Sequence, residues 1–554
     1  MKLITMNLLR AFPECLPFPL TPLRVLLMVS VLGSWAQALP AMAAESPVDA
    51  GSSAGSALSF DIFEFVVDGN SLLNDAQIEK AMSSFMGERK TLREVDGARA
   101  ALEKTYHDAG YLTVLVSIPE QKIEGGAVSL HVVEAVVDRL RVKGAEYTLP
   151  SGIKARIPEL AEGNVPNFPK MQQQLAALNR SADARITPIL KPGKTPGTVD
   201  VQLDTEDQLA LHGSVEFSNR QTPNTTAQRL SASLRYDNLF QSRHSLNLTA
   251  QVAPQRPSDA RVLAASYVVP VGDDGSVLGF NTLLSRSEFA SLANAPGLGL
   301  LGNTTTFGLR YTQPLGSNDT FSHLASVGIE HKKIGQTLVV VGGGGTDSPI
   351  TYTPLASSYT ANFFGQDRST VFDLAGTFGL RGLLNNTDAA FDAKRPGASA
   401  GFLALRTGMQ HTENFGRWSV YGKVEWQLAS GPLVPSEQFV AGGAESVRGY
   451  LEGERAADGG VRATMEFRTP KFKPSATSDW QMSGLFFFDA ASLTMRQPQA
   501  TQPSRHALRG VGLGMRMNAP LGVALEIDAA HALVDGDTTH AGDNRIQART
   551  LWNF

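Results

Sequence analysis

The sequence predicts two small α+β modules followed by a sixteen-stranded antiparallel transmembrane β-barrel. Three observations predict this fold. Residues 60–206 contain the order strand, helix, helix, strand, strand twice. Residues 207–554 instead contain short segments in which apolar residues alternate with small or polar ones. After the N-terminal segment there is no apolar run of about 18 residues, so any part that crosses a membrane would have to cross it with strands.

The composition excludes several classes of protein. The chain has 49 Lys and Arg residues against 53 Asp and Glu residues, a net charge of −4, whereas a nucleic-acid-binding protein usually has a basic excess or a basic stripe. Hydrophobic residues make up 42% of the chain, which is enough for a buried core and argues against disorder. The only cysteine is Cys15, in a segment that we expect to be removed, so we expect neither disulfides nor thiol catalysis.

The N-terminus has the pattern of a secretory signal. Arg24 is followed by the apolar run 25–35 and then by Ala-Met-Ala at 41–43, a small-x-small cleavage site. We predict a signal peptide over residues 1–43 and a short linker over residues 44–59. The alternative interpretation is a transmembrane anchor, for which the apolar run is too short.

The two predicted modules span residues 60–137 and 138–206. In the first, Asn74 is placed to cap one helix, and Thr91-x-x-Glu94 is a capping box for the other. Strands are predicted over 61–67, 111–118 and 127–136, and then over 138–142, 185–190 and 199–203; the helices of the second module are predicted over 153–160 and 171–178. Small sheets of this kind have open edges to which an extended protein segment can add a strand, although the modules could also act only as spacers.

The predicted barrel spans residues 207–554. An even strand number is required when both ends of an antiparallel barrel lie on the periplasmic side, and sixteen strands enclose a lumen wide enough for water or an extended chain. The candidate strands are 208–219, 226–237, 243–254, 260–271, 275–288, 302–314, 320–333, 352–366, 369–382, 397–411, 416–429, 461–470, 482–495, 507–519, 521–534 and 545–554. The chain ends in a closing strand with Trp552 and a terminal aromatic residue, Phe554, a pattern that resembles the assembly signal of bacterial outer-membrane barrels.

A long loop over residues 430–460 interrupts the strand pattern, and loops of this length are usually functional. Glycines would allow it to bend tightly into the lumen, and an arginine would anchor it through a bidentate contact with a carboxylate. Its central residues are Val447, Arg448, Gly449 and Tyr450. The candidate partner is Asp489, although an exposed loop and an aspartate that faces a water-filled pore remain the alternative interpretation.

Asp489 lies in an apolar strand in which alternation separates two faces. Phe487, Asp489 and Ala491 would share one face, while Phe486 and Phe488 would lie on the other. A carboxylate in such a strand is costly unless it faces the lumen and binds a cation.

These motifs resemble those of the two-partner secretion transporters, the TpsB family of ShlB/FhaC/HecB-type haemolysin secretion/activation proteins. Residues 447–450 resemble the VRGY signature of the family's long extracellular loop, and Phe487-x-Asp489 resembles its F-x-D-x-G strand motif, with Ala491 in place of the final glycine. The family has a signal peptide, two POTRA modules and a sixteen-stranded barrel, in the order that this chain shows.

The resemblance implies an outer-membrane pore that secretes one large TpsA-like exoprotein of the haemolysin or adhesin type. The POTRA modules would lie in the periplasm and capture the client, and Arg448 would be held in the lumen by Asp489. The implied partners are this exoprotein, outer-membrane lipid and, during biogenesis, the barrel-assembly machinery, with no nucleic acid. Some members carry an N-terminal plug helix, but residues 44–59 resemble a linker, so we predict no plug helix or a vestigial one.

Other functions remain as alternatives. A barrel-assembly factor of the same superfamily usually has five modules, and a passive porin would need neither the modules nor the loop motif. We expect no enzymatic activity, because the sequence has no nucleophile elbow or other catalytic constellation. We also expect no cofactor and no metal site, since His506, His531 and His540 lack the spacing of metal ligands.

Overall fold

The structure is a computed structural model of the 554-residue chain. It describes residues 59–272, 274–291, 299–335, 337–339, 345–347, 349–475, 478–498 and 503–554. The predicted signal peptide over residues 1–43 lies outside the described residues. So do the predicted linker, except for its last residue, and the place where a plug helix would occur.

The first module is a three-stranded sheet with two helices. Its elements are β1 (Phe60–Ile62), β2 (Glu64–Asp68), α1 (Asp75–Met82), β3 (Gly87–Lys90), α2 (Leu92–Asp108), β4 (Val114–Ser117) and β5 (Ala127–Glu134). The sheet order is β2-β5-β4, with β2 parallel and β4 antiparallel to β5. Both helices start with capping boxes, at Asn74 and Thr91. The predicted first strand is split, because β1 pairs with the short strand β3, which the sequence analysis missed.

The second module repeats this topology. Its elements are β6 (Val136–Lys143), α3 (Pro150–Ala155), the 3₁₀ turn Pro158–Leu160, α4 (Phe168–Leu178), β7 (Ala184–Pro192) and β8 (Thr198–Asp207). The order β6-β8-β7 matches that of the first sheet, again with one parallel and one antiparallel pair. The predicted helix over 153–160 is a short α-helix followed by a 3₁₀ turn that starts at Pro158, because proline cannot continue the helical hydrogen bonds.

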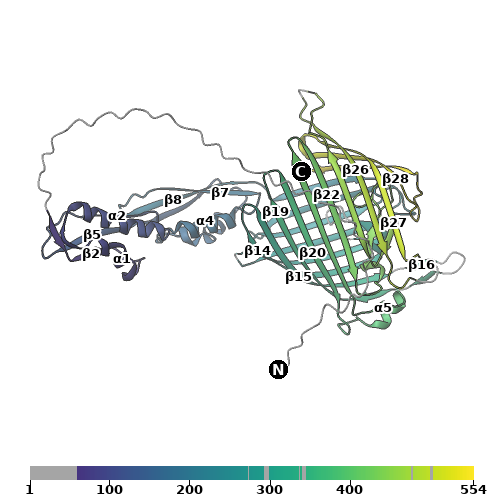
Figure 1. Ribbon diagram of the computed structural model, residues 1–554, viewed down its shortest axis with the longest axis horizontal. Coiled ribbons are helices and arrows are strands. Elements are labelled where there is room, and N and C mark those ends of the chain that lie inside the picture. Colours follow the sequence, from purple (N-terminus) through teal and green to yellow (C-terminus); the bar gives the residue numbers. More distant parts are fainter. Residues whose placement is uncertain are drawn as a thin grey trace, which may run out of the picture. The chain divides into compact units, whose positions relative to one another are not determined.

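The barrel closes on itself with sixteen antiparallel strands over the described residues, and each corresponds to one predicted segment. The strands run side by side around the wall, as Figure 1 shows, and the wall closes where β29 pairs with β9. Thr353 interrupts one strand, so that it carries two labels, β18 and β19. The bounds are β9 (Leu211–Ser218), β10 (Arg229–Leu239), β11 (His244–Val252), β12 (Ala260–Val271), β13 (Ser276–Ser291), β14 (Gly299–Ser317), β15 (Phe321–Gly335), β18 (Ile350–Tyr352), β19 (Pro354–Phe364), β20 (Arg368–Gly379), β21 (Leu403–Phe415), β22 (Trp418–Ala429), β25 (Gly459–Arg468), β26 (Gln481–Thr494), β27 (Arg505–Asn518), β28 (Val523–Ala532) and β29 (Asn544–Asn553).

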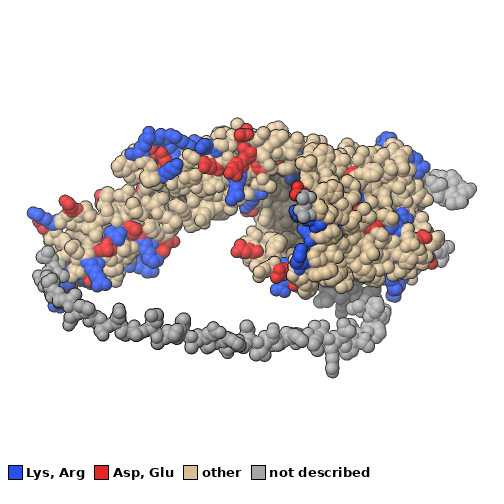
Figure 2. Space-filling model, turned by 90° about the horizontal axis from the view of Figure 1, so that it is seen from above, with Lys and Arg blue, Asp and Glu red and all other residues tan. Residues whose placement is uncertain are grey.

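The outer surface of the barrel is apolar at alternating positions of its strands. Large exposed side chains on it include Phe217, Leu234, Leu263, Phe280, Phe307, Val327, Met409, Phe486, Leu513 and Ile546. Figure 2 shows few charged side chains on the part of the wall that faces the viewer. This alternation is what a lipid-facing wall requires, because its outward residues contact hydrocarbon while its inward residues line the lumen.

The two ends of the barrel differ in the length of their connections. At the end from which β9 starts, the connections are short turns, such as the one between β10 and β11, except for residues 469–480 between β25 and β26; the longest loops lie at the other end. Helix α5 (Asp388–Lys394) lies in one of the long loops. Short turns are typical of the periplasmic end of bacterial barrels and long loops of the extracellular end. Among the described residues, no helix is long and apolar enough to cross a membrane.

Candidate functional site

The loop between β22 and β25 packs inside the barrel. Two short strands, β23 (Phe439–Ala441) and β24 (Arg455–Ala457), pair and make it a hairpin. Val447 and Tyr450 are fully buried. The Tyr450 hydroxyl donates to the carbonyl of Val534 at 2.6 Å and accepts from the backbone N–H of Arg509 at 3.3 Å. The predicted loop segment is therefore fixed against the inner wall and is not an exposed turn.

Arg448 makes a bidentate contact with the carboxylate of Asp489 on β26. Its Nε donates to Oδ2 at 2.7 Å and its Nη2 donates to Oδ1 at 2.9 Å. The backbone N–H of Arg448 also donates to Oδ2, at 3.0 Å. The side chains are buried, with 4% and 0% of their surfaces exposed. Such a planar, two-point contact sets the position and direction of the loop tip.

The strand motif presents its residues as alternation predicts. Phe487, Asp489 and Ala491 on β26 are buried and face inward, whereas Phe486 and Phe488 are exposed on the outer face. The Arg448 guanidinium lies 3.6 Å from the centroid of the Phe487 ring, a distance that allows a cation–π contact. Ala491 packs in the same apolar cluster as the loop residues Val447 and Tyr450. The alanine at the position of the motif's glycine therefore does not displace the loop.

Two further carboxylates lie beside Arg448 and were not predicted from the sequence. Its Nη1 donates to Glu466 on β25 at 2.7 Å and lies 3.8 Å from Asp528 on β28. Two more arginines offset this negative charge, since Arg468 lies 2.6 Å from Glu466 and Arg516 lies 2.7 Å from Asp528. The result is a network of three arginines and three carboxylates, in which Arg448 and all three carboxylates are buried while Arg468 and Arg516 reach the lumen surface. The cross-strand pairing of these positions was the only signal that could have found them.

Two glycines on β27 make room, one for the loop and one for the Phe487 ring beneath it. A Cβ atom at Gly510 would lie 2.0 Å from the carbonyl oxygen of Arg448, and one at Gly512 would lie 2.4 Å from the Phe487 ring. Neither contact is sterically possible. The wall is therefore shaped for a loop that lies directly on it.

Another buried carboxylate, Asp458, holds the extracellular end of the loop. Asp458 is fully buried and forms a two-point contact with Arg395, which follows α5. Asp458 also accepts from the backbone N–H groups of Leu433 at 2.8 Å and Arg496 at 2.6 Å. Three extracellular loops are thus joined by one side chain over the mouth of the barrel. A single aspartate in a loop carries no sequence signal for this role.

A cavity of about 890 Å³ lies between the loop and the opposite wall. Small polar residues of β11 to β21 form much of that wall, including Asn247, Thr249, Ser266, Asn281, Thr304, Thr306, Ser358 and Thr377. Its charged residues are largely paired with one another. Arg310 lies 3.3 Å from Glu330, and Lys332 lies 3.2 Å from Glu330 and 2.8 Å from Glu437.

The C-terminal residues lie at the closing seam. Phe554 exchanges both backbone hydrogen bonds with Gly213, just within β9, at 2.8 and 3.0 Å. The Trp552 Nε1 donates to the carbonyl of Leu521 at 3.1 Å, and the rings of Trp552 and Phe554 lie 4.8 Å apart. Both rings are exposed on the outer surface near the periplasmic end.

The family follows from a comparison of the sequence with known families. Residues 197–517, more than half of the chain, match the family described as "Haemolysin secretion/activation protein ShlB/FhaC/HecB". The chain belongs to this family. Residues 60–135, the first module, match a second family, described as "POTRA domain, ShlB-type". Members of this family are outer-membrane transporters of two-partner secretion, so the chain is a secretion pore of the outer membrane with its modules in the periplasm.

Individual relatives agree with this assignment. "Outer membrane transporter CdiB" of Dickeya dadantii (strain 3937) is 24% identical over 403 residues, which cover 71% of this chain and 69% of that protein. The protein of the same name from Escherichia coli O6:K15:H31 (strain 536 / UPEC) is 24% identical over 421 residues, 71% of this chain and 66% of that protein.

Solved structures show the same fold. CdiB from Escherichia coli has a TM-score of 0.61 at 18% identity, with 92% of this chain and 93% of that chain covered. BamA from Haemophilus ducreyi lacking POTRA domains 1-3 has a TM-score of 0.54 at 16% identity, with 89% and 100% covered.

Proposed function

We propose that a large exoprotein crosses this pore as an extended chain between the loop and the opposite wall, while Arg448 holds the loop against β25–β28. The observation that supports this path is the cavity on one side of the loop, opposite the buried contact of Arg448 with Asp489. The roles of Val447, Gly449 and Tyr450 are to shape the loop tip, and Phe487 and Ala491 support it from the wall.

The chemistry of the open wall suits a client of varied sequence. Serine, threonine and asparagine side chains offer hydrogen bonds that water can replace, and they present no large apolar surface to which an unfolded chain would adhere. The paired charges leave no strong field of one sign. We infer that the lumen conducts the client and that recognition takes place elsewhere.

We propose that the first module recognises the client at the edge formed by β2. The two edges of its sheet differ. At β4, the N–H of Val116 donates to Glu103 at 3.2 Å and the carbonyl of Val114 lies 3.2 Å from Nε2 of His107, so side chains of α2 already occupy this edge. β2 pairs only with β5 among the described strands. An extended segment of the client can therefore add beside β2 through backbone hydrogen bonds. By its matching strand order, we take the second module to be a POTRA module as well.

We propose one dedicated TpsA-like exoprotein as the client, and a transporter without enzymatic activity. Outer-membrane lipid would contact the apolar outer wall. The barrel-assembly machinery would recognise the terminal strand that ends in Trp552 and Phe554. The likeness in fold to BamA makes barrel assembly the alternative function.

Deletion of the gene separates these functions. We expect one large exoprotein to disappear from the medium while the barrel proteins of the outer membrane keep their normal amounts, and the full-length gene should restore it. A broad loss of outer-membrane barrels would instead show an assembly factor. A change in small-solute permeability alone would show a passive porin, and either result would overturn the proposal.

A further inference from the structure

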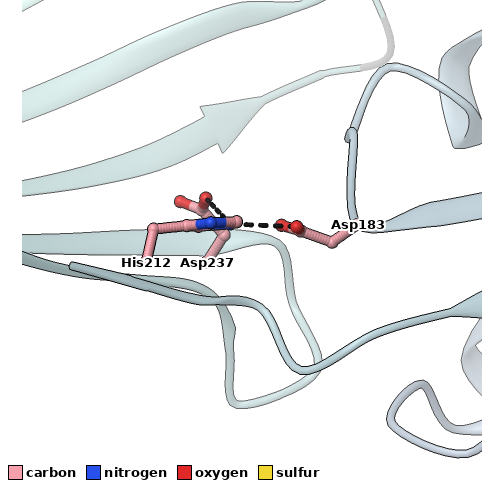
Figure 3. A group of neighbouring side chains, drawn as sticks. All are labelled: Asp183, His212 and Asp237. Carbon is pink, nitrogen blue, oxygen red and sulfur yellow. Dashed lines mark ion pairs between the residues drawn. The ribbon is translucent and has the colours of Figure 1, made fainter. Parts of the chain in front are cut away.

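Three side chains with metal-ligating atoms meet where the second module joins the barrel. Asp183 lies between α4 and β7 of the module, His212 lies on β9 and Asp237 lies on β10. The Nε2 atom of His212 is 2.9 Å from a carboxylate oxygen of Asp183 and 3.9 Å from one of Asp237. Figure 3 marks both ion pairs with dashed lines. The three ligand atoms lie within 4.8 Å of one another.

The register of the first barrel hairpin places this group at the periplasmic end of the lumen. His212 is paired with Arg235 across β9 and β10, and Asp237 follows two residues later on the same face. Farther along β9, that face carries the buried residues Glu216 and Ser218 and therefore points into the lumen. Asp183 reaches this edge from the second module, so the group lies at the entrance through which a client would pass.

The donor set fits a divalent transition-metal ion. One imidazole nitrogen and two carboxylate oxygens are ligands that Zn²⁺ accepts, and water can complete a tetrahedral site. Ligand atoms about 2.0–2.1 Å from Zn²⁺ in a tetrahedron lie about 3.3–3.4 Å apart. The distances of 2.9 and 3.9 Å bracket this value, and no two of the three ligand atoms lie more than 4.8 Å apart, so side-chain adjustments without a backbone change would form the site.

A second observation points to a ligand. The Nε2 atom of His212 is shielded from solvent and has no hydrogen-bond partner of acceptable geometry, despite the nearby carboxylate of Asp183. A shielded nitrogen that faces two carboxylates either carries a proton and pairs with them or donates its lone pair to an ion that they share, and the binding experiment below separates the two. A neutral imidazole in this position directs a lone pair at the space that the two carboxylates border.

The groups around the three side chains are compatible with this role. Gln208 donates to Asp183 at 3.2 Å and Ser245 donates to the other oxygen of Asp237, which orients both carboxylates as outer partners do in metal sites. Arg235 competes, since it lies 3.0 Å from Asp237. Its side chain is about half exposed, 53%, so it can turn into solvent when a cation binds.

We propose that Asp183, His212 and Asp237 bind one zinc ion, which fastens the second module to the first barrel hairpin at the lumen entrance. Hydrogen bonds between the second module and the turn of the first barrel hairpin support this role. Arg243, in the turn between β10 and β11, donates to the carbonyl of Ala177 at 2.9 Å, and Gln241 in the same turn accepts from the backbone N–H of Leu149 at 3.0 Å. This proposal does not depend on the identity of the client or on the path that it takes.

Zinc titration of the purified full-length protein tests the proposal. The protein is prepared in detergent without a polyhistidine tag, treated with a chelator and then titrated with Zn²⁺ by calorimetry. We expect one ion per chain in the wild type, and an affinity reduced about tenfold or more in His212→Ala, in Asp183→Asn and in Asp237→Asn. Replacement by Co²⁺ should give visible absorption bands that His212→Ala loses.

His244→Ala is the matched control, because His244 lies at the same end of the barrel on β11 but contacts Tyr267 instead. We expect it to bind zinc as the wild type does, and the heat-dependent gel mobility of every variant shows whether its barrel is folded. Three results would overturn the proposal: a wild type that binds no zinc, as expected if the side chains form only an ion-paired contact; variants that bind as the wild type does; or a His244→Ala protein that loses the same ion.

Discussion

The two sides of the barrel lumen are built on different principles. On the side of β25–β28 the wall carries large side chains and buried charges, and the loop lies directly on it through Arg448. On the side of β11–β21 the wall carries mainly small polar side chains and borders a cavity. Its charged residues are few and paired, and the loop contacts this side where Glu437 pairs with Lys332. Both sides belong to one closed sheet and share the same apolar outer surface.

This difference shows how one barrel can combine a fixed element with an open path. Buried ion pairs contribute little net stability but strongly specify geometry, because removal of one partner leaves an uncompensated charge. Small polar side chains do not fix the position of a segment beside them, which suits a surface past which many different residues must move. We therefore expect substitutions on the loop side to have large effects and equivalent substitutions on the open side to have small ones.

The largest effect is expected from Arg448→Ala. It leaves the carboxylates of Asp489, Glu466 and Asp528 near one another without their shared cation, at a cost of about 3–5 kcal/mol for a broken buried pair. We expect the loop to leave the wall and secretion of the exoprotein to fall about tenfold or more. The amount of exoprotein in the medium measures this, at equal amounts of folded barrel.

The matched control for Arg448→Ala is Arg310→Ala on the open side. Arg310 also faces the lumen and pairs with a carboxylate, Glu330, but Lys332 still neutralises that carboxylate when Arg310 is removed. Secretion by this variant should stay close to that of the wild type. Equal losses in the two variants would remove the distinction between the sides.

A smaller effect is expected from Gly510→Ala. The added methyl group would collide with the carbonyl oxygen of Arg448, and overpacking of this kind costs about 1–3 kcal/mol. Gly422→Ala on β22 is the control, because no atom lies within 4 Å of its added Cβ. The midpoint temperature of heat-dependent gel mobility should fall for Gly510→Ala and change little for Gly422→Ala. The opposite order would show that the loop does not depend on this contact.

The barrel was predictable strand by strand because one face of each strand contacts lipid and the other faces the lumen. A lipid-facing residue and a lumen-facing residue alternate, so the segment that contains Thr305, Phe307 and Leu309 can be recognised without knowing its neighbours. The short strand β3 had no such pattern, since neither face of Gly87–Lys90 is fully buried. Local alternation is therefore informative only where both faces of a strand have a fixed environment.

The candidate site was predictable only in part. Arg448 and Asp489 could be paired because both stand in recognisable motifs. Glu466 and Asp528 join them through the order of strands around the barrel, which single-strand patterns do not contain. The same reason hid the group around His212, whose three members come from a module and two strands.

The central claim is that the client passes along the open wall, and crosslinking from single cysteines tests it most directly. Cys15 is the chain's only cysteine and lies in the predicted signal peptide, so Thr306→Cys on the open wall and Ala530→Cys beneath the loop would each be unique in the mature protein. A client with one cysteine is stalled in the pore by a stably folded domain at its C-terminal end. We expect a disulfide to Thr306→Cys and none to Ala530→Cys; a crosslink to Ala530→Cys, or equal crosslinking at the two positions, would contradict this path.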